Sequence, residues 1–266
     1  MIGGSGFYHL FAEEDRERVE METPYGATSD VLTVGAVAGR QVAFVPRHGA
    51  GHTIPPHRIN YRANVWALAS LGVDRVIAPC AVGSLRVALG RGHVVVCDQL
   101  IDATRGHRDA TFFDGPEVAH LSAPSPYCPE LRGAALAAAR DARLTAHDGG
   151  TVVVIDGPRF ATAAESRMHA RNGADVINMT QYPEVVLARE LGLCYASMGL
   201  VTDYDAGVDG SGLELDGITP VTQEEVLRVF AANIPPLRRA VFRMIESLPG
   251  ERACGCGAGR PRSISH

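Results

Sequence analysis

The 266-residue sequence contains no lysine, so all 25 of its basic residues are arginine. This absence excludes a Schiff-base lysine and the lysine of a P-loop nucleotide site. Any anion that the protein binds must therefore contact arginine, histidine, hydroxyl or backbone N–H donors.

Long apolar runs and excess positive charge are also missing. No segment approaches the length of about 20 apolar residues that a membrane-spanning helix needs. We expect no signal peptide, no membrane partner and a cytoplasmic protein. The net charge of −5 disfavours nucleic acid as a partner. With 46% hydrophobic residues, the composition is that of a globular protein.

Cysteine is sparse, with six residues in the chain. Four of them are far apart in mostly apolar surroundings and are interpreted as small core residues: Cys80, Cys97, Cys128 and Cys194. The pair in Cys254-Gly255-Cys256 lies in a glycine-rich tail, where it can form a strained disulfide, contribute to a metal site or have no role. Two ligands do not make a zinc site, so we expect no metal.

Apolar runs typical of strands alternate with amphipathic helical patterns, and most runs end in small, polar turns. Strands are expected at 31–37, 41–45, 75–78, 94–97, 151–155, 175–178 and 194–200. Helices are expected at 58–71, 130–143, 163–172, 183–191 and 222–248, with a kink or break at Pro235-Pro236. A long polar loop is expected at 104–126 and a glycine-rich loop at 207–219. This alternation predicts an α/β fold: a single domain, residues 1–249, with a central mixed β-sheet flanked by helices. Residues 250–266 are expected to form a flexible tail.

Two carboxylates follow the apolar run at 194–200. Asp203 and Asp205 are two residues apart, so they point the same way from the end of a strand. Open α/β sheets bind their ligands at strand ends. Carboxylates there can accept hydrogen bonds from a ring N–H and an exocyclic amine, or pass a proton to a leaving nitrogen. The alternative is an Asx turn that closes the strand.

Two other turns have the composition of anion sites. Residues 3–6 form a glycine-rich turn that contains the Ser5 hydroxyl, although only Ile2 remains of the strand that normally precedes such a turn. Arg47 and His48 follow an expected strand, and a solvated loop is the alternative for them. Nearby histidines at 52 and 57 lack the cysteine or carboxylate that would complete a metal site.

Taken together, eight ordered motifs resemble the trimeric purine nucleoside phosphorylase family, most closely its 5′-methylthioadenosine phosphorylase branch. The motifs lie at 2–7, 23–26, 47–49, 60–64, 83–86, 157–160, 178–180 and 202–205, and the resemblance extends from residue 2 to about 248. It implies phosphorolysis of S-methyl-5′-thioadenosine to adenine and 5-methylthioribose 1-phosphate, in purine and methionine salvage. It also implies a homotrimer that uses inorganic phosphate as a co-substrate and needs no cofactor.

The resemblance assigns a role to each matching position. Phosphate would contact Ser5, Arg47, His48, Cys80, Ala81 and Thr180, with Cys80 offering mainly its backbone N–H. The ribose would lie on Met179 and the purine would stack on Phe160. Asp203 would share a proton with the imidazole nitrogen of the leaving base, and Asp205 would accept from its exocyclic amine. The 5′ group would lie against Val226 and against His120 of a neighbouring subunit.

Three alternatives remain open. A phosphorylase for 6-oxopurine nucleosides, including methylthioinosine, would share the phosphate site, but such relatives usually have Asn at the position of Asp203. A nucleoside-binding protein without catalysis is the second alternative. The presence of all the expected phosphate-binding residues argues against it. A nucleoside hydrolase would not need Arg47 and Thr180. A Ser-His-Asp hydrolase is unsupported because Ser5 and Ser84 lack the G-x-S-x-G context.

Overall fold

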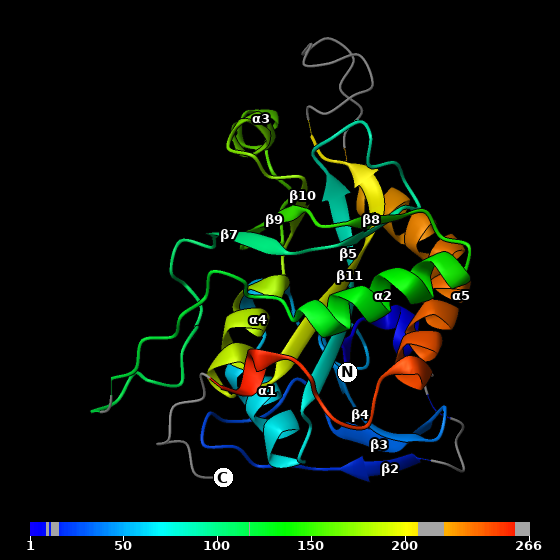
Figure 1. Ribbon diagram of the computed structural model, residues 1–266. Coiled ribbons are helices and arrows are strands. Elements are labelled where there is room, and N and C mark those ends of the chain that lie inside the picture. Colours follow the sequence, from blue (N-terminus) through cyan, green and yellow to red (C-terminus); the bar gives the residue numbers. More distant parts are fainter. Residues whose placement is uncertain (9–10, 12–15, 117, 207–220, 259–266) are drawn as a thin grey trace.

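The computed structural model describes residues 1–8, 11, 16–116, 118–206 and 221–258, with Ser5 described by its backbone alone (Figure 1). Its central sheet has seven strands in the order β7-β9-β10-β5-β11-β6-β8. These strands are β5 (Arg75–Ser84), β6 (Val94–Val96), β7 (Gln99–Ala103), β8 (Ala146–Asp148), β9 (Thr151–Ile155), β10 (Val176–Asn178) and β11 (Cys194–Tyr204). The glycine-rich loop expected at 207–219 lies outside the described residues.

The sheet is mixed, as the sequence predicted. β11 pairs with β5 in parallel, whereas β10 pairs with β5 and β6 pairs with β11 in the antiparallel sense. In the described part of the chain, five α-helices accompany it: α1 (Tyr61–Ser70), α2 (Pro129–Asp141), α3 (Ala163–Arg171), α4 (Gln181–Glu190) and α5 (Gln223–Ser247). Among the described residues, no helix combines the length and the apolar character needed to cross a bilayer.

The alternation of side chains along β11 separates two cores. Tyr195 and Val201 belong to a cluster that includes residues of α1 and α4. Ala196, Met198 and Leu200 belong to a second cluster, which includes residues of α2 and α5. Successive strand residues point to opposite faces, so α1 and α4 cover one face of β11 and α2 and α5 cover the other (Figure 1). A strand covered on both faces requires an almost continuous apolar run, as the sequence has here.

A second sheet of four strands has the order β1-β4-β3-β2. Its strands are β1 (Ile2–Gly3), β2 (Arg16–Val19), β3 (Leu32–Val37) and β4 (Arg40–Pro46). Where the sequence analysis found only Ile2, a two-residue strand pairs in parallel with Val45 and Pro46. The Met1 ammonium donates to the Ala43 carbonyl at 2.5 Å. The glycine-rich turn, a 3-10 helix at Ser5–Phe7, therefore does follow a paired strand.

Helix α5 continues through Pro235 and Pro236, where the sequence analysis expected a kink or a break, so the break does not occur. A proline inside a helix costs about 3 kcal/mol or more. The helix buries Leu237, Val241 and Met244 completely after the prolines, within the second core. Burial of each such side chain contributes about 1.5–3 kcal/mol, which offsets the lost backbone hydrogen bonds.

The C-terminal segment, expected to be a flexible tail from residue 250, makes specific contacts in its described part. Ala253 donates its backbone N–H to Glu130 Oε2 at 2.8 Å, and Arg252 Nη1 donates to the Gly192 carbonyl at 2.9 Å. Cys256, in a 3-10 helix at Gly255–Gly257, is 5% exposed. The partners of this segment in these two hydrogen bonds are 60 or more residues away in the chain, so no local sequence pattern predicts them. Residues 259–266 lie outside the description.

Candidate active site

A cavity of about 430 Å³ lies near the C-terminal ends of β5 and β11. This volume is in the range of small-molecule sites. Most of the residues that the sequence analysis selected line it: Arg47, His48, Cys80, Ala81, Phe160, Met179, Thr180, Asp203, Asp205 and Val226. Ser5 belongs to the adjacent turn, whose Gly4 lines the cavity, but its side chain is outside the description. His120 is exposed in the 104–126 loop and does not line the cavity of its own chain.

Arg47 has a buried partner that the sequence analysis missed. Glu184 of α4 accepts from Arg47 Nε at 2.5 Å and from Nη2 at 3.1 Å. Both side chains are almost completely buried, at 2% and 1% exposure. Burial alone would lower the pKa of Arg47, but the Glu184 carboxylate outweighs burial, so the pKa is raised and the guanidinium stays charged.

The ion pair limits what Arg47 offers to an anion. Its other hydrogen bonds go to the carbonyls of Pro79 and Ile2, both at 3.3 Å. Four of the five guanidinium N–H groups are thus engaged, and Glu184 neutralises the charge. An anion in this region has to rely on backbone and hydroxyl donors more than the sequence suggested.

His48 presents an acceptor to the cavity when its ring is neutral. Nδ1 lies 2.9 Å from the Ile54 carbonyl oxygen, which can only accept, so Nδ1 carries a hydrogen and Nε2 does not. Burial and then the neighbouring Arg47 charge lower the pKa of His48 to about 4. The ring is therefore neutral near pH 7, and an approaching phosphate oxygen needs an additional proton between itself and Nε2.

This arrangement predicts that phosphate binding takes up a proton. The KM for phosphate should rise by nearly tenfold per pH unit above the second pKa of phosphate, because each bound ligand then draws one proton from solvent. Initial rates at pH 7.5 and 8.5 with varied phosphate measure this effect. In His48→Gln the amide donates without a titrating proton, so the slope should flatten. A steep slope that persists in that variant contradicts the role of His48.

The two carboxylates line the same cavity and are buried, at 5% exposure for Asp203 and 2% for Asp205. Asp203 Oδ1 accepts from the Thr202 hydroxyl at 2.6 Å, and Asp205 Oδ2 accepts from the Ser166 hydroxyl. Burial raises the pKa of Asp203. Burial, reinforced by the charge of Asp203, raises the pKa of Asp205 to about 6. Two coupled carboxyls with raised pKa values retain a proton more readily than isolated ones, as a proton donor to a leaving group requires.

Gly83 provides the space that Asp203 occupies. The two residues are paired across β5 and β11, directly after a register shift. A Cβ at Gly83 would lie 3.0 Å from Asp203 Oδ2 and 2.9 Å from Ile177 Cγ2. A side chain at this position would therefore displace the carboxylate.

We expect Gly83→Ala to lower kcat by about 10²-fold, because a displacement of about 1 Å in a reacting group has that effect. The KM for phosphate should stay within twofold, since the Arg47 region is not touched. Steady-state kinetics with each substrate varied separates the two parameters. Gly133→Ala is the matched control, because a Cβ on this exposed residue of α2 meets nothing within 4 Å. An unchanged kcat in Gly83→Ala contradicts the argument.

Asn178 organises the turn between β10 and α4, a role that the sequence analysis did not assign although it placed the residue in the motif at 178–180. Its Oδ1 accepts from the backbone N–H groups of Thr180 and Gln181, both at 2.7 Å, and its Nδ2 donates to the Ala81 carbonyl at 2.8 Å.

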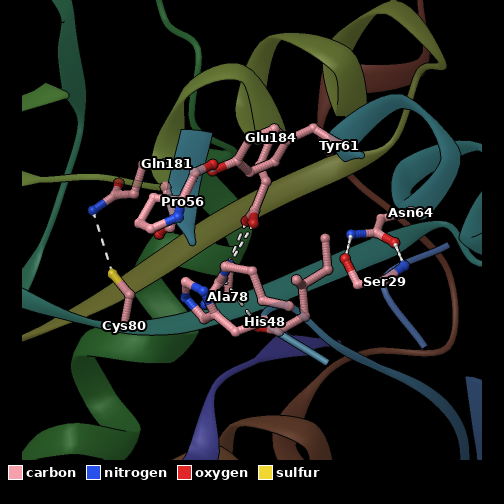
Figure 2. Close-up of polar contacts among 12 residues, drawn as sticks. Ser29, His48, Pro56, Tyr61, Asn64, Ala78, Cys80, Gln181 and Glu184 are labelled. Carbon is pink, nitrogen blue, oxygen red and sulfur yellow. Dashed lines mark hydrogen bonds and ion pairs between the residues drawn. The ribbon is translucent and has the colours of Figure 1, made fainter. Parts of the chain in front are cut away.

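The Cys80 thiol lies 3.6 Å from Gln181 Nε2 (Figure 2) and 3.4 Å from Ser197 Oγ. Its sulfur is thus engaged by core residues.

Two of the eight motifs, at 23–26 and 60–64, contact each other or the loop beside them rather than the cavity. Asn60 donates to the Tyr25 carbonyl at 2.7 Å. Asn64 exchanges two hydrogen bonds with Ser29, one to its hydroxyl and one from its backbone N–H, both at 2.8 Å (Figure 2). The motifs at 23–26 and 60–64 therefore connect the loop before β3 to the start of α1.

The family model for the phosphorylase superfamily matches residues 1–246. The chain belongs to this superfamily. A purine nucleoside phosphorylase of Streptomyces coelicolor is 53% identical, over 97% of this chain and 92% of its own. S-methyl-5′-thioadenosine phosphorylases of Mycolicibacterium smegmatis and Pyrococcus furiosus are 51% and 48% identical, each over 96% of this chain and over 92% and 95% of their own.

Solved structures of the superfamily agree with this assignment. Methylthioadenosine phosphorylase from Schistosoma mansoni in complex with adenine has a TM-score of 0.84 at 37% identity, over 92% of this chain and 89% of its own. A methylthioadenosine phosphorylase from an Antarctic soil metagenomic library has a TM-score of 0.87 at 35% identity, over 97% of this chain and 89% of its own. The family resemblance and the fold expected from the sequence are confirmed.

Proposed function

We propose that the chain catalyses phosphorolysis of S-methyl-5′-thioadenosine, or a close 5′-substituted 5′-deoxyadenosine, to adenine and the 5-substituted ribose 1-phosphate. The observation that carries the proposal is the buried carboxylate pair, Asp203 and Asp205, in one cavity with Arg47, His48 and Thr180. The names of the Mycolicibacterium and Pyrococcus relatives support the same substrate.

Phosphate is the nucleophile in this proposal. A phosphate oxygen forms a bond to C1′ of the ribose as the C1′–N9 bond breaks, and the electron pair of that bond moves into the purine. Asp203 shares a proton with N7, which makes the base a better leaving group. The oxocarbenium-like charge on the sugar is stabilised by the adjacent phosphate. No cofactor is needed, and Phe160 and Met179 position base and ribose.

The carboxylates select the base. Adenine donates hydrogen bonds from its exocyclic amine, and Asp205 supplies an acceptor for them. A 6-oxopurine would place a carbonyl there and leave buried polar groups unpaired, which discriminates strongly between substrates. The name of the Streptomyces relative, purine nucleoside phosphorylase, keeps a 6-oxopurine phosphorylase as the second candidate.

The first experiment measures adenine release from methylthioadenosine with and without phosphate, beside inosine. Phosphate-dependent release with inert inosine supports the proposal. Cleavage of inosine favours the second candidate. Release without phosphate favours a hydrolase, and no turnover of either nucleoside favours a binding protein.

The 5′ group is expected to lie against Val226, where Leu227 and Phe230 of α5 also line the cavity. Because His120 is outside the cavity of its own chain, it would act there only from a neighbouring subunit. This arrangement requires an oligomer, for which we propose a homotrimer. We also propose that the protein is cytoplasmic. The mass of the native protein in solution tests the trimer.

His120→Ala is expected to raise the KM for methylthioadenosine by about tenfold, a contact worth roughly 1–3 kcal/mol. The KM for phosphate should not change. His107→Ala is the matched control, because this histidine is also exposed on the 104–126 loop. Equal effects of the two substitutions would remove His120 from the site.

A further inference from the structure

Four cysteines meet at the end of β11 opposite to the carboxylates. Their sulfur atoms all lie within 4.8 Å of one another: Cys128, Cys194, Cys254 and Cys256. Cys128 is the N-cap of α2, Cys194 is the first residue of β11, and the other two come from the C-terminal segment. Cys194 Sγ lies 3.2 Å from Cys254 Sγ. The sequence analysis considered the last two alone and expected no metal, because the other ligands are 60 or more residues away.

We propose that these four cysteines bind one Zn²⁺ ion as a tetrahedral tetrathiolate site. With Zn–S bonds of about 2.3 Å, the sulfurs of such a site are roughly 3.8 Å apart. The observed cluster, with all sulfurs within 4.8 Å, reaches this geometry with small side-chain movements. Four soft thiolate ligands, without a histidine or carboxylate among them, match zinc better than calcium or magnesium.

The residues around the cluster suit the negative charge of zinc bound to four thiolates. Each thiol loses its proton to solvent on binding, so the zinc and four thiolates together carry two negative charges. Arg252 lies beside Cys194, and Arg189 donates from Nη1 to the Cys256 carbonyl at 3.3 Å. The buried Nε of Arg189 has no hydrogen-bond partner in the described part of the chain. The N-terminus of α2 adds its partial positive charge at Cys128.

The site has a structural role. It joins the C-terminal segment to the first residues of α2 and β11, which are otherwise held to it by the hydrogen bonds of Arg252 and Ala253. Cys194 and Asp203 are nine residues apart on one strand, which corresponds to about 30 Å. Zinc is therefore expected to raise the thermal stability of the protein and to leave the chemistry in the cavity unchanged.

The test begins with metal analysis of the full chain, purified without a metal-affinity step under reducing, anaerobic conditions. We expect one equivalent of zinc per chain. Removal of the zinc should lower Tm without changing kcat at low temperature. Titration of the metal-free protein with Co²⁺ should give thiolate-to-cobalt charge-transfer bands and the intense visible bands of tetrahedral cobalt, saturating at one equivalent.

The double variant Cys254→Ser/Cys256→Ser should lose the zinc and the cobalt spectrum. Cys97→Ser, a buried free thiol outside the cluster, should retain both. If the double variant does not fold, the Co²⁺ titration of the unaltered protein tests whether the four cysteines bind a metal ion. Failure to bind Zn²⁺ or Co²⁺ under reduction overturns the proposal, as does iron at one equivalent or a mass showing two disulfides in the reduced preparation. None of these outcomes depends on the nucleoside that the enzyme cleaves.

Discussion

Replacement of Asp203 by Asn is expected to lower kcat for methylthioadenosine by about 10²–10⁴-fold, the usual contribution of a general acid. The amide has nearly the same shape but cannot share a proton with N7 of the departing base. Adenine release at saturating phosphate measures the loss. The KM for phosphate should stay close to that of the unaltered enzyme, because Asp203 is not in the Arg47 region.

Two controls show whether the loss is chemical. Tm should be similar or higher, since the substitution removes one of two coupled buried carboxyls whose pKa values are raised by burial. The ratio of inosine to methylthioadenosine cleavage should increase, because an amide donor suits a 6-oxopurine. A full rate with methylthioadenosine would contradict the assignment of Asp203 as the acid.

Glu184→Gln is expected to lower the free energy of unfolding by about 3–5 kcal/mol, the cost of leaving a buried charge without its partner. Glu184 accepts from Arg47 twice and from the Tyr195 hydroxyl at 2.8 Å. The amide turns one acceptor into a donor and leaves the charge of Arg47 uncompensated. Chemical denaturation measures the change in stability.

The double variant Arg47→Met/Glu184→Met separates stability from function. Replacing a buried ion pair by apolar residues of similar volume is often neutral or stabilising, so most of the lost stability should return. Phosphate-dependent activity should remain low, because the last free N–H of Arg47 is gone. If Glu184→Gln unfolds like the unaltered protein, the ion pair does not stabilise the fold. If the double variant is fully active, Arg47 does not bind phosphate.

Local patterns predicted local structure well. The expected strand at 151–155 matches β9, and the expected helix at 163–172 matches α3 to within one residue. A capping box begins α3, with Thr162 accepting from the Glu165 backbone and Glu165 accepting from that of Thr162. Both depend on interactions within a few residues. A kink or a break was expected at Pro235 and Pro236, and the helix does not break there, since the gain from packing α5 against the second core is not visible in its local sequence.

The sequence by itself determined the α/β class, the superfamily and most of the cavity residues that were assigned a role. The class follows from periodicity and the position of the two carboxylates from the end of a strand, whereas the superfamily and the other cavity residues follow from the resemblance of the eight motifs. Only the tertiary structure decided that Glu184 neutralises Arg47 and that Cys128 and Cys194 join Cys254 and Cys256. Arg47 and Glu184 are 137 residues apart in the chain, and Cys194 and Cys254 are 60 residues apart. Burial and electrostatics act through space, so such partners are identified only once the chain has folded.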